Sequence, residues 1–98
     1  MEDEICGAIQ NRQVIQFYYE QQLRIVEPFT LGYHKGTGNL VLSAYRVGGY
    51  SKSEKEPPWR LFIVDNIETM EVTSTIAQNS REGYNPNDSR MSEIICTV

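Results

Sequence analysis

Short runs of β-branched and aromatic residues, separated by polar or Gly- and Pro-containing stretches, occupy most of the chain after its first dozen residues. Residues of these types fit a pleated, half-buried surface better than a helix. We therefore expect strands at 13–20, 23–33, 39–46, Trp59–Val64 and 67–75, and a sixth at 92–98.

The first residues follow a different pattern, because Ile5, Ala8 and Ile9 recur at helical spacing between Glu2 and Arg12. One helix and five to six short strands, in a chain of 98 residues, cannot cover both faces of an open sheet. The prediction is one domain of mainly β class: a small, strongly bent barrel with one short N-terminal helix at its end.

Turn-forming residues mark the connections between these strands. Pro28 cannot donate to a strand ladder, so its strand should bulge or lie at an edge there. Gly36 to Gly38 suits a hairpin turn, and Asp65 with Asn66 suits a tight turn. The stretch from Val47 to Pro58 is Gly-rich, then charged, then Pro-Pro, which predicts an exposed loop that either carries function or simply connects.

Charge is distributed unevenly along the chain. The net charge of −4 argues against a nucleic-acid partner, since such proteins usually carry a basic excess. Yet the segment from Arg24 to Arg60 holds six basic residues against three acids, a formal +3, whereas the remainder holds three against ten, or −7. The middle of the chain can therefore present a positive face on an acidic protein.

The two cysteines, Cys6 and Cys96, lie near opposite ends of the chain and form neither a CxxC pair nor a metal-ligand set with His34. We expect buried, reduced thiols in a cytoplasmic protein, with a disulfide joining the termini as the alternative. The sequence has no leader-like segment and no long apolar run, which predicts no membrane association.

Two arginines lie at the starts of apolar strands. By strand alternation Arg24 shares its face with Val26, Thr30 and His34. Arg60 in the same way shares its face with Phe62 and Val64. A guanidinium in that position lies at a rim, with its stem over apolar surface. If both face one opening, they can grip a phosphate or carboxylate together.

Tyr19, Tyr45 and Trp59 could then stack a base or ring beside the two arginines. The alternative is structural: the aromatic side chains pack, and the arginines form ion pairs of small net value. Candidate acidic partners are Glu20 and Glu27 for Arg24, and Glu56, Asp65 and Glu68 for Arg60.

Three segments together resemble the bacterial WYL domain family: AIQNRQVIQFYYE, LRIVEPFTLGYHKGTGNLVLSAYR and WRLFIVDNIETMEV. The family's R-x-x-P-type segment corresponds to Arg24 through Pro28. Its R-x-F-x-x-D-x-I segment corresponds to 60–67. The tripeptide that names the family falls on 40–42, where only Leu42 matches, and Asn66 replaces an arginine, which removes one cation.

The resemblance implies an SH3-like or Sm-like barrel and a ligand-sensing module of bacterial regulators, tied to DNA-damage response, phage defence or CRISPR systems. Such modules look like nucleic-acid or nucleotide sensors that use one basic and aromatic face. They usually follow a winged-helix or helix-turn-helix domain, and the sequence shows none. We therefore expect a stand-alone version that acts as a dimer or as the partner of a DNA-binding regulator.

We therefore predict a non-catalytic sensor that binds a single-stranded nucleic acid or a nucleotide-like anion. The ligand-binding residues expected are Arg24, Arg60, Tyr45, Trp59, His34, Lys35 and Arg46. The alternative is a protein-interaction or homodimerisation module that uses a sheet edge near Pro28 or at 92–98. We expect no enzyme, cofactor or metal site, because no nucleophile, carboxylate pair or metal-ligand set has recognisable spacing.

Overall fold

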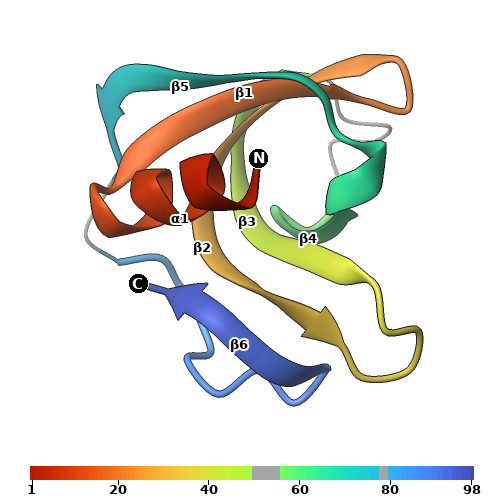
Figure 1. The fold of residues 1–98 in the computed structure, drawn as a ribbon. Coiled ribbons are helices and arrows are strands. Elements are labelled where there is room, and N and C mark those ends of the chain that lie inside the picture. The colour runs from red at the N-terminus through yellow and green to blue at the C-terminus, as the bar shows by residue number, and fades with distance from the viewer. Residues whose placement is uncertain (50–55, 78–79) are drawn as a thin grey trace.

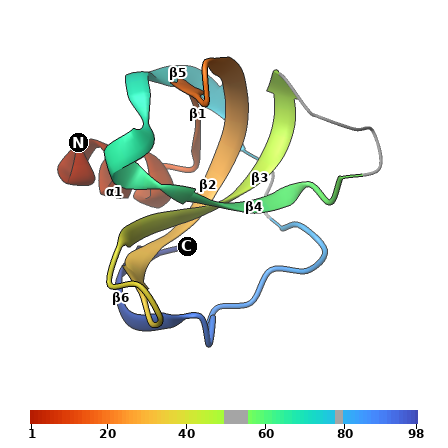
Figure 2. The same ribbon diagram turned by 90° about the vertical axis from the view of Figure 1, so that its right-hand side faces the viewer.

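The computed structural model describes residues 1–49, 56–77 and 80–98, which form a mainly β fold with one short helix (Figures 1 and 2). In chain order the elements are α1 (Glu2–Gln10), β1 (Gln13–Tyr19), β2 (Gln22–His34), β3 (Leu40–Gly49), β4 (Trp59–Ile63), the 3-10 turn η1 (Val64–Asn66), β5 (Glu68–Ile76) and β6 (Met91–Thr97). The helix and all the predicted strands are present, so the mainly β prediction is confirmed.

The sheet is organised around β2. The strand order is β4-β3-β2-β1-β5, and β6 also pairs with β2, all antiparallel. The sheet curls around α1, with β1 and β5 on one side of the helix and β6 on the other (Figure 1). Among the described residues no pairing joins β4 to β5, so the sheet is not closed into a barrel.

The predicted irregularity at Pro28 is confirmed as a bulge. The pairing of β2 with β3 shifts between Pro28 and Thr30, at the place where β2 leaves β1 and begins to pair with β6. The extra residue reverses the alternation of faces: Val26 and Leu31, an odd number of positions apart, are both in the core. The prediction that Arg24 shares its face with Thr30 is therefore wrong. The expected edge near Pro28 is also wrong, because β2 is the central strand.

Helix α1 covers the concave side of the sheet. Its buried residues are Ile5, Ala8 and Ile9, as the helical spacing predicts. Ile15, Phe17 and further side chains from the strands and from the segment around η1 complete one core: Tyr19, Val26, Leu31, Leu42, Ala44, Phe62, Val64 and Ile67. The core is thus continuous from the helix to β4.

The prediction of reduced thiols is wrong in this structure, because Cys6 and Cys96 form a disulfide with a Cα–Cα distance of 5.8 Å. Their separation of 90 residues gives no local signal for pairing. The fold supplies it: α1 packs against β6, which brings the two ends of the chain together. The disulfide ties the helix to an edge strand.

The strand connections agree in part with the sequence. Gly38, with φ of 75°, lies in the turn between β2 and β3, and η1 forms the turn expected at Asp65 and Asn66. The predicted loop begins later than expected, because β3 continues through Gly49. Positions 50–55 of that loop lie outside the described residues. Within the described part of the chain, no helix has the length and apolar character needed to span a membrane.

Candidate functional site

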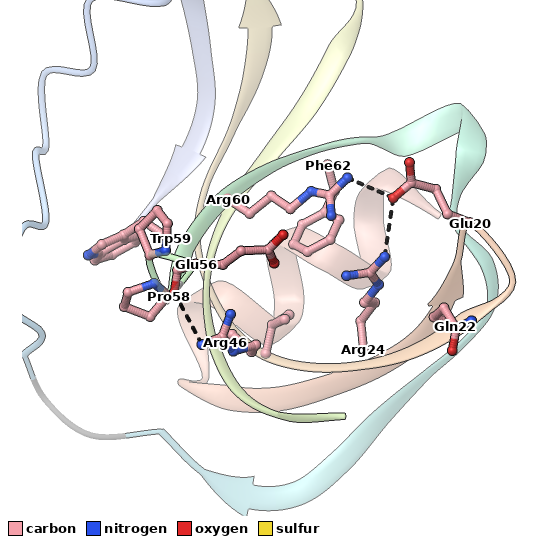
Figure 3. A pocket seen from close by; sticks show the side chains of 11 residues that line it. Glu20, Gln22, Arg24, Arg46, Glu56, Pro58, Trp59, Arg60 and Phe62 are labelled. Carbon is pink, nitrogen blue, oxygen red and sulfur yellow. Dashed lines mark hydrogen bonds and ion pairs between the residues drawn. The ribbon is translucent and has the colours of Figure 1, made fainter. Parts of the chain in front are cut away.

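A pocket of about 620 Å³ opens between the β1–β2 turn and β4 (Figure 3). Val26 and Phe62 line it and also belong to the hydrophobic core. Arg24 and Arg60 lie two residues before them on the same strands, so alternation directs both side chains into the same hollow. The pocket is the solvent-facing continuation of the core.

Both arginines meet one carboxylate oxygen. Nη2 of Arg24 lies 3.2 Å from Glu20 Oε1, and Nη2 of Arg60 lies 2.8 Å from the same atom (Figure 3). The Arg24 side chain is 8% exposed, whereas that of Arg60 is 39% exposed. Of the acids suggested from the sequence, Glu20 was a candidate for Arg24 but not for Arg60. The two cations therefore share this carboxylate oxygen.

Tyr19 contacts both arginines and also β4. Its ring centre lies 5.9 Å from the Arg24 guanidinium carbon and 5.2 Å from that of Arg60. Its hydroxyl accepts a hydrogen bond from the backbone N–H of Ile63 at 3.0 Å, and its carbonyl accepts from Arg24. Tyr19 thus links β1 to the edge of β4 and fixes the position of both arginines.

Arg46 and Glu56 line the pocket on the side away from Glu20 (Figure 3). Nη2 of Arg46 donates to the Glu56 carbonyl at 3.5 Å, and the Arg46 backbone N–H donates to the Pro58 carbonyl. Among the described residues that line the pocket, three arginines stand against two glutamates, a formal charge of +1. The pocket is weakly positive in a protein whose net charge is −4.

Trp59 contributes to the pocket and is also fixed from behind. The residue lines one side of the hollow, while its ring packs on the other side of β4 against Phe29 at 4.8 Å, Tyr45 at 5.4 Å and Tyr84 at 6.3 Å between ring centres. Its Nε1 donates to the Glu82 carbonyl at 2.8 Å. These contacts fix Trp59, and with it the start of β4, at the border of the pocket.

Three of the predicted site residues lie outside this pocket. Tyr45 is part of the aromatic cluster behind Trp59, and Arg81 lies over its ring at 4.5 Å. His34 ends β2, at the opposite end of that strand from Arg24, and Nδ1 of His34 accepts from two backbone N–H groups of the β2–β3 turn. Lys35 follows it in the same turn. The structure therefore brings together Arg24, Arg46, Trp59 and Arg60 only.

Sequence reasoning missed a second charged contact, between Arg81 and Glu27. Nε and Nη2 of Arg81 donate to the two carboxylate oxygens of Glu27, each at 2.7 Å. These hydrogen bonds raise the pKa of Arg81 above its usual value. Glu27 is 3% exposed, and an acid inside the apolar run from Ile25 to Phe29 was a signal that a cation must meet it. The contact fastens the segment after β5 over the aromatic cluster.

No protein-family model, curated protein or solved structure matches the chain significantly. The resemblance to WYL domains accordingly stays a prediction from the sequence motifs. Within residues 1–49, 56–77 and 80–98, no group of three His, Cys, Asp or Glu side chains is placed to hold a metal ion.

Proposed function

We propose that the chain is a non-catalytic sensor module that binds a nucleotide-like anion, free or as a unit of a single-stranded nucleic acid. The observation that carries the proposal is the convergence of Arg24 and Arg60, from different strands, on one oxygen atom at the mouth of a pocket. Two guanidinium groups aimed at one point suit an anionic oxygen of a phosphate.

The pocket supports a ligand of nucleotide size. A volume of about 620 Å³ falls within the range of small-molecule sites, about 300 to 1,000 Å³. Its walls combine cations with the apolar surfaces of Trp59, Pro57 and Pro58, so a phosphate and a planar ring find suitable neighbours in one hollow. In this proposal Arg24 and Arg60 hold phosphate, Arg46 adds charge and Trp59 contacts the base or sugar.

The sequence resemblance supports the same proposal. The arginine segments that resemble WYL domains contain Arg24 and Arg60, and an SH3-like arrangement of the curved sheet is part of the proposal. Tyr45, His34 and Lys35 line no part of the pocket, so they receive no ligand contact here.

The test is a fluorescence-anisotropy titration with labelled nucleotides and short single-stranded oligonucleotides at 50 mM and 200 mM salt. Binding should weaken as salt rises, because phosphate contacts release counterions. Arg60→Ala should weaken binding about tenfold, the size expected for losing a hydrogen bond to a charged group.

The matched control is Lys35→Ala, which removes one exposed positive charge away from the pocket. Equal affinity of the two variants would show that general charge, and not the pocket, binds the ligand. Absent or salt-insensitive binding would remove the proposal.

A second candidate, a protein-interaction or dimerisation module, is favoured by the sheet edges. Among the described residues β5 pairs with β1 alone, and most of the residues of β5 are exposed, with Ile76 67% exposed and Val72 40% exposed. In the part of the chain that the structure describes, β6 pairs with β2 alone, as expected for an edge at 92–98. Size-exclusion chromatography with light scattering at 10 and 200 µM tests self-association; a monomer at both concentrations would argue against a homodimer.

A further inference from the structure

Glu20 occupies an unusual backbone position for a glutamate. With Gln21 it forms the two-residue turn between the paired residues Tyr19 and Gln22, and both turn residues have left-handed φ, 54° and 63°. Such turns favour Asn-Gly or Asp-Gly, because a longer side chain makes the left-handed conformation costly. The turn itself therefore does not account for a glutamate there.

The position of the Glu20 carboxylate accounts for the glutamate. It projects from the turn to the point where Arg24 and Arg60 converge, although its side chain is 61% exposed (Figure 3). The pair with Arg60 is exposed on both sides, and such a pair contributes little stability. Arg24 is nearly buried, but it also donates to the Tyr19 carbonyl, a contact that does not involve Glu20. A ligand anion that binds both Nη2 groups at their point of convergence takes the place of this carboxylate oxygen.

We propose that Glu20 is an internal competitor, whose carboxylate occupies the position that the ligand's phosphate takes when the ligand binds. The ligand group able to displace this carboxylate is a terminal phosphomonoester. This inference rests on the proposed function. It names the ligand more narrowly: a nucleoside monophosphate or the phosphorylated end of a single strand, in preference to the phosphodiesters inside the strand.

Charge explains the preference. Among the described lining residues the pocket carries a formal +1 with Glu20 in place. Replacing a carboxylate by a phosphodiester exchanges one negative charge for another, so the arginines gain nothing in charge. A phosphomonoester at pH 7 carries about −1.5 to −2. The Glu20 carboxylate is part of the chain, so it loses no translational freedom when it binds the arginines. A free ligand does lose this freedom and therefore needs the additional charge to displace the carboxylate.

The competitor role and a purely structural role predict opposite signs. If Glu20 only held the arginines in position, removing its charge would weaken ligand binding. If Glu20 competes, Glu20→Gln should strengthen binding about threefold to tenfold. The matched control is Glu93→Gln, which removes an exposed negative charge from β6, away from the pocket, and should bind like the wild type.

The experiment measures anisotropy with hexathymidylate labelled at its 3′ end, bearing either a 5′ phosphate or a 5′ hydroxyl, for the wild type and the Glu20→Gln and Glu93→Gln variants. We expect the wild type to bind the 5′-phosphorylated strand at least about fivefold more tightly than the 5′-hydroxyl strand. Glu20→Asn serves as a second neutral variant, because asparagine tolerates left-handed φ and the variant should fold at least as well. Thermal unfolding confirms that each variant is folded.

Each outcome decides a different statement. Weaker binding by both neutral variants would overturn the competitor role, and equal wild-type affinity for the two strands would overturn the terminal-phosphate preference; the proposed function survives either result. Stronger binding by both neutral variants than by the wild type and Glu93→Gln supports the competitor role. Absence of binding in every variant removes both this inference and the proposed function.

Discussion

Reducing the disulfide between Cys6 and Cys96 should destabilise the protein strongly, and its size follows from the position of the link. The cysteines are separated by 90 residues, so the link closes nearly the whole chain into a loop. In the chain-entropy model a loop of that length lowers the entropy of the unfolded state by about 15 cal/mol/K, or about 4.5 kcal/mol at 25 °C. A domain of this size has a total stability of about 5 to 15 kcal/mol.

Thermal unfolding followed by circular dichroism, with and without reductant, measures the effect. We expect the unfolding midpoint of the reduced protein to fall by about 15 to 25 °C. Urea unfolding adds a sharper criterion, because the link acts on the unfolded chain: reduction should raise the slope of free energy against urea concentration as the unfolded state expands.

The control is the double variant Cys6→Ala with Cys96→Ala, which should resemble the reduced protein and should not respond to reductant. Wild type with reductant keeps both sulfur atoms, so it separates loss of the covalent link from loss of packing. Unfolding midpoints that agree within about 3 °C with and without reductant would refute the argument, since even 1 kcal/mol shifts the midpoint by about 4 °C or more.

Two further predictions concern stability. Gly49 has φ of 80°, and a Cβ there would meet the Leu23 carbonyl, so Gly49→Ala should lower the free energy of unfolding by about 2 kcal/mol in urea titrations. Gly7→Ala should instead raise it by about 0.5 to 1 kcal/mol, because a Cβ on this helical residue has no atom within 4 Å; equal effects would contradict both. The hydrogen bond from Arg90 lowers the pKa of Asp88 in the folded protein below its value in the unfolded chain. The ionised carboxylate therefore stabilises the fold above its unfolded pKa of about 4, and this stability is lost as the pH falls through the lower folded pKa. Asp88→Asn should therefore flatten the acid side of a plot of unfolding midpoint against pH; an unchanged acid slope would exclude the contribution.

The secondary structure was predictable because its signals are local. β1 was expected at 13–20 and spans Gln13–Tyr19, since Ile15, Phe17 and Tyr19 alternate with polar or exposed neighbours. The face of each strand was predictable only as far as the first bulge. For β2 that limit is Pro28, beyond which the assignment of faces failed.

Contacts between distant segments were not predictable, because each depends on where the curved sheet places its edges. Cys96 reaches Cys6 only through the packing of α1 against β6. Arg81 reaches Glu27 only because the segment after β5 crosses the outer side of β2 and β3. No spacing in the sequence reports either arrangement.

The site lies between these two cases. The alternation of residues correctly placed Arg24 on the face of Val26 and Arg60 on the face of Phe62, so the sequence predicted which side chains accompany each arginine. The sequence did not predict that the two arginines meet. They meet because, among the described residues, the edge of β4 faces the β1–β2 turn without a strand paired to it, and the backbone N–H of Ile63 donates to the hydroxyl of Tyr19 instead. A sheet that closed at this point would fill the gap with strand pairs and leave no hollow for a guest. The pocket therefore exists because the sheet stays open there, and side-chain contacts of Tyr19 and Glu20 join the two sides of the gap in place of strand pairing.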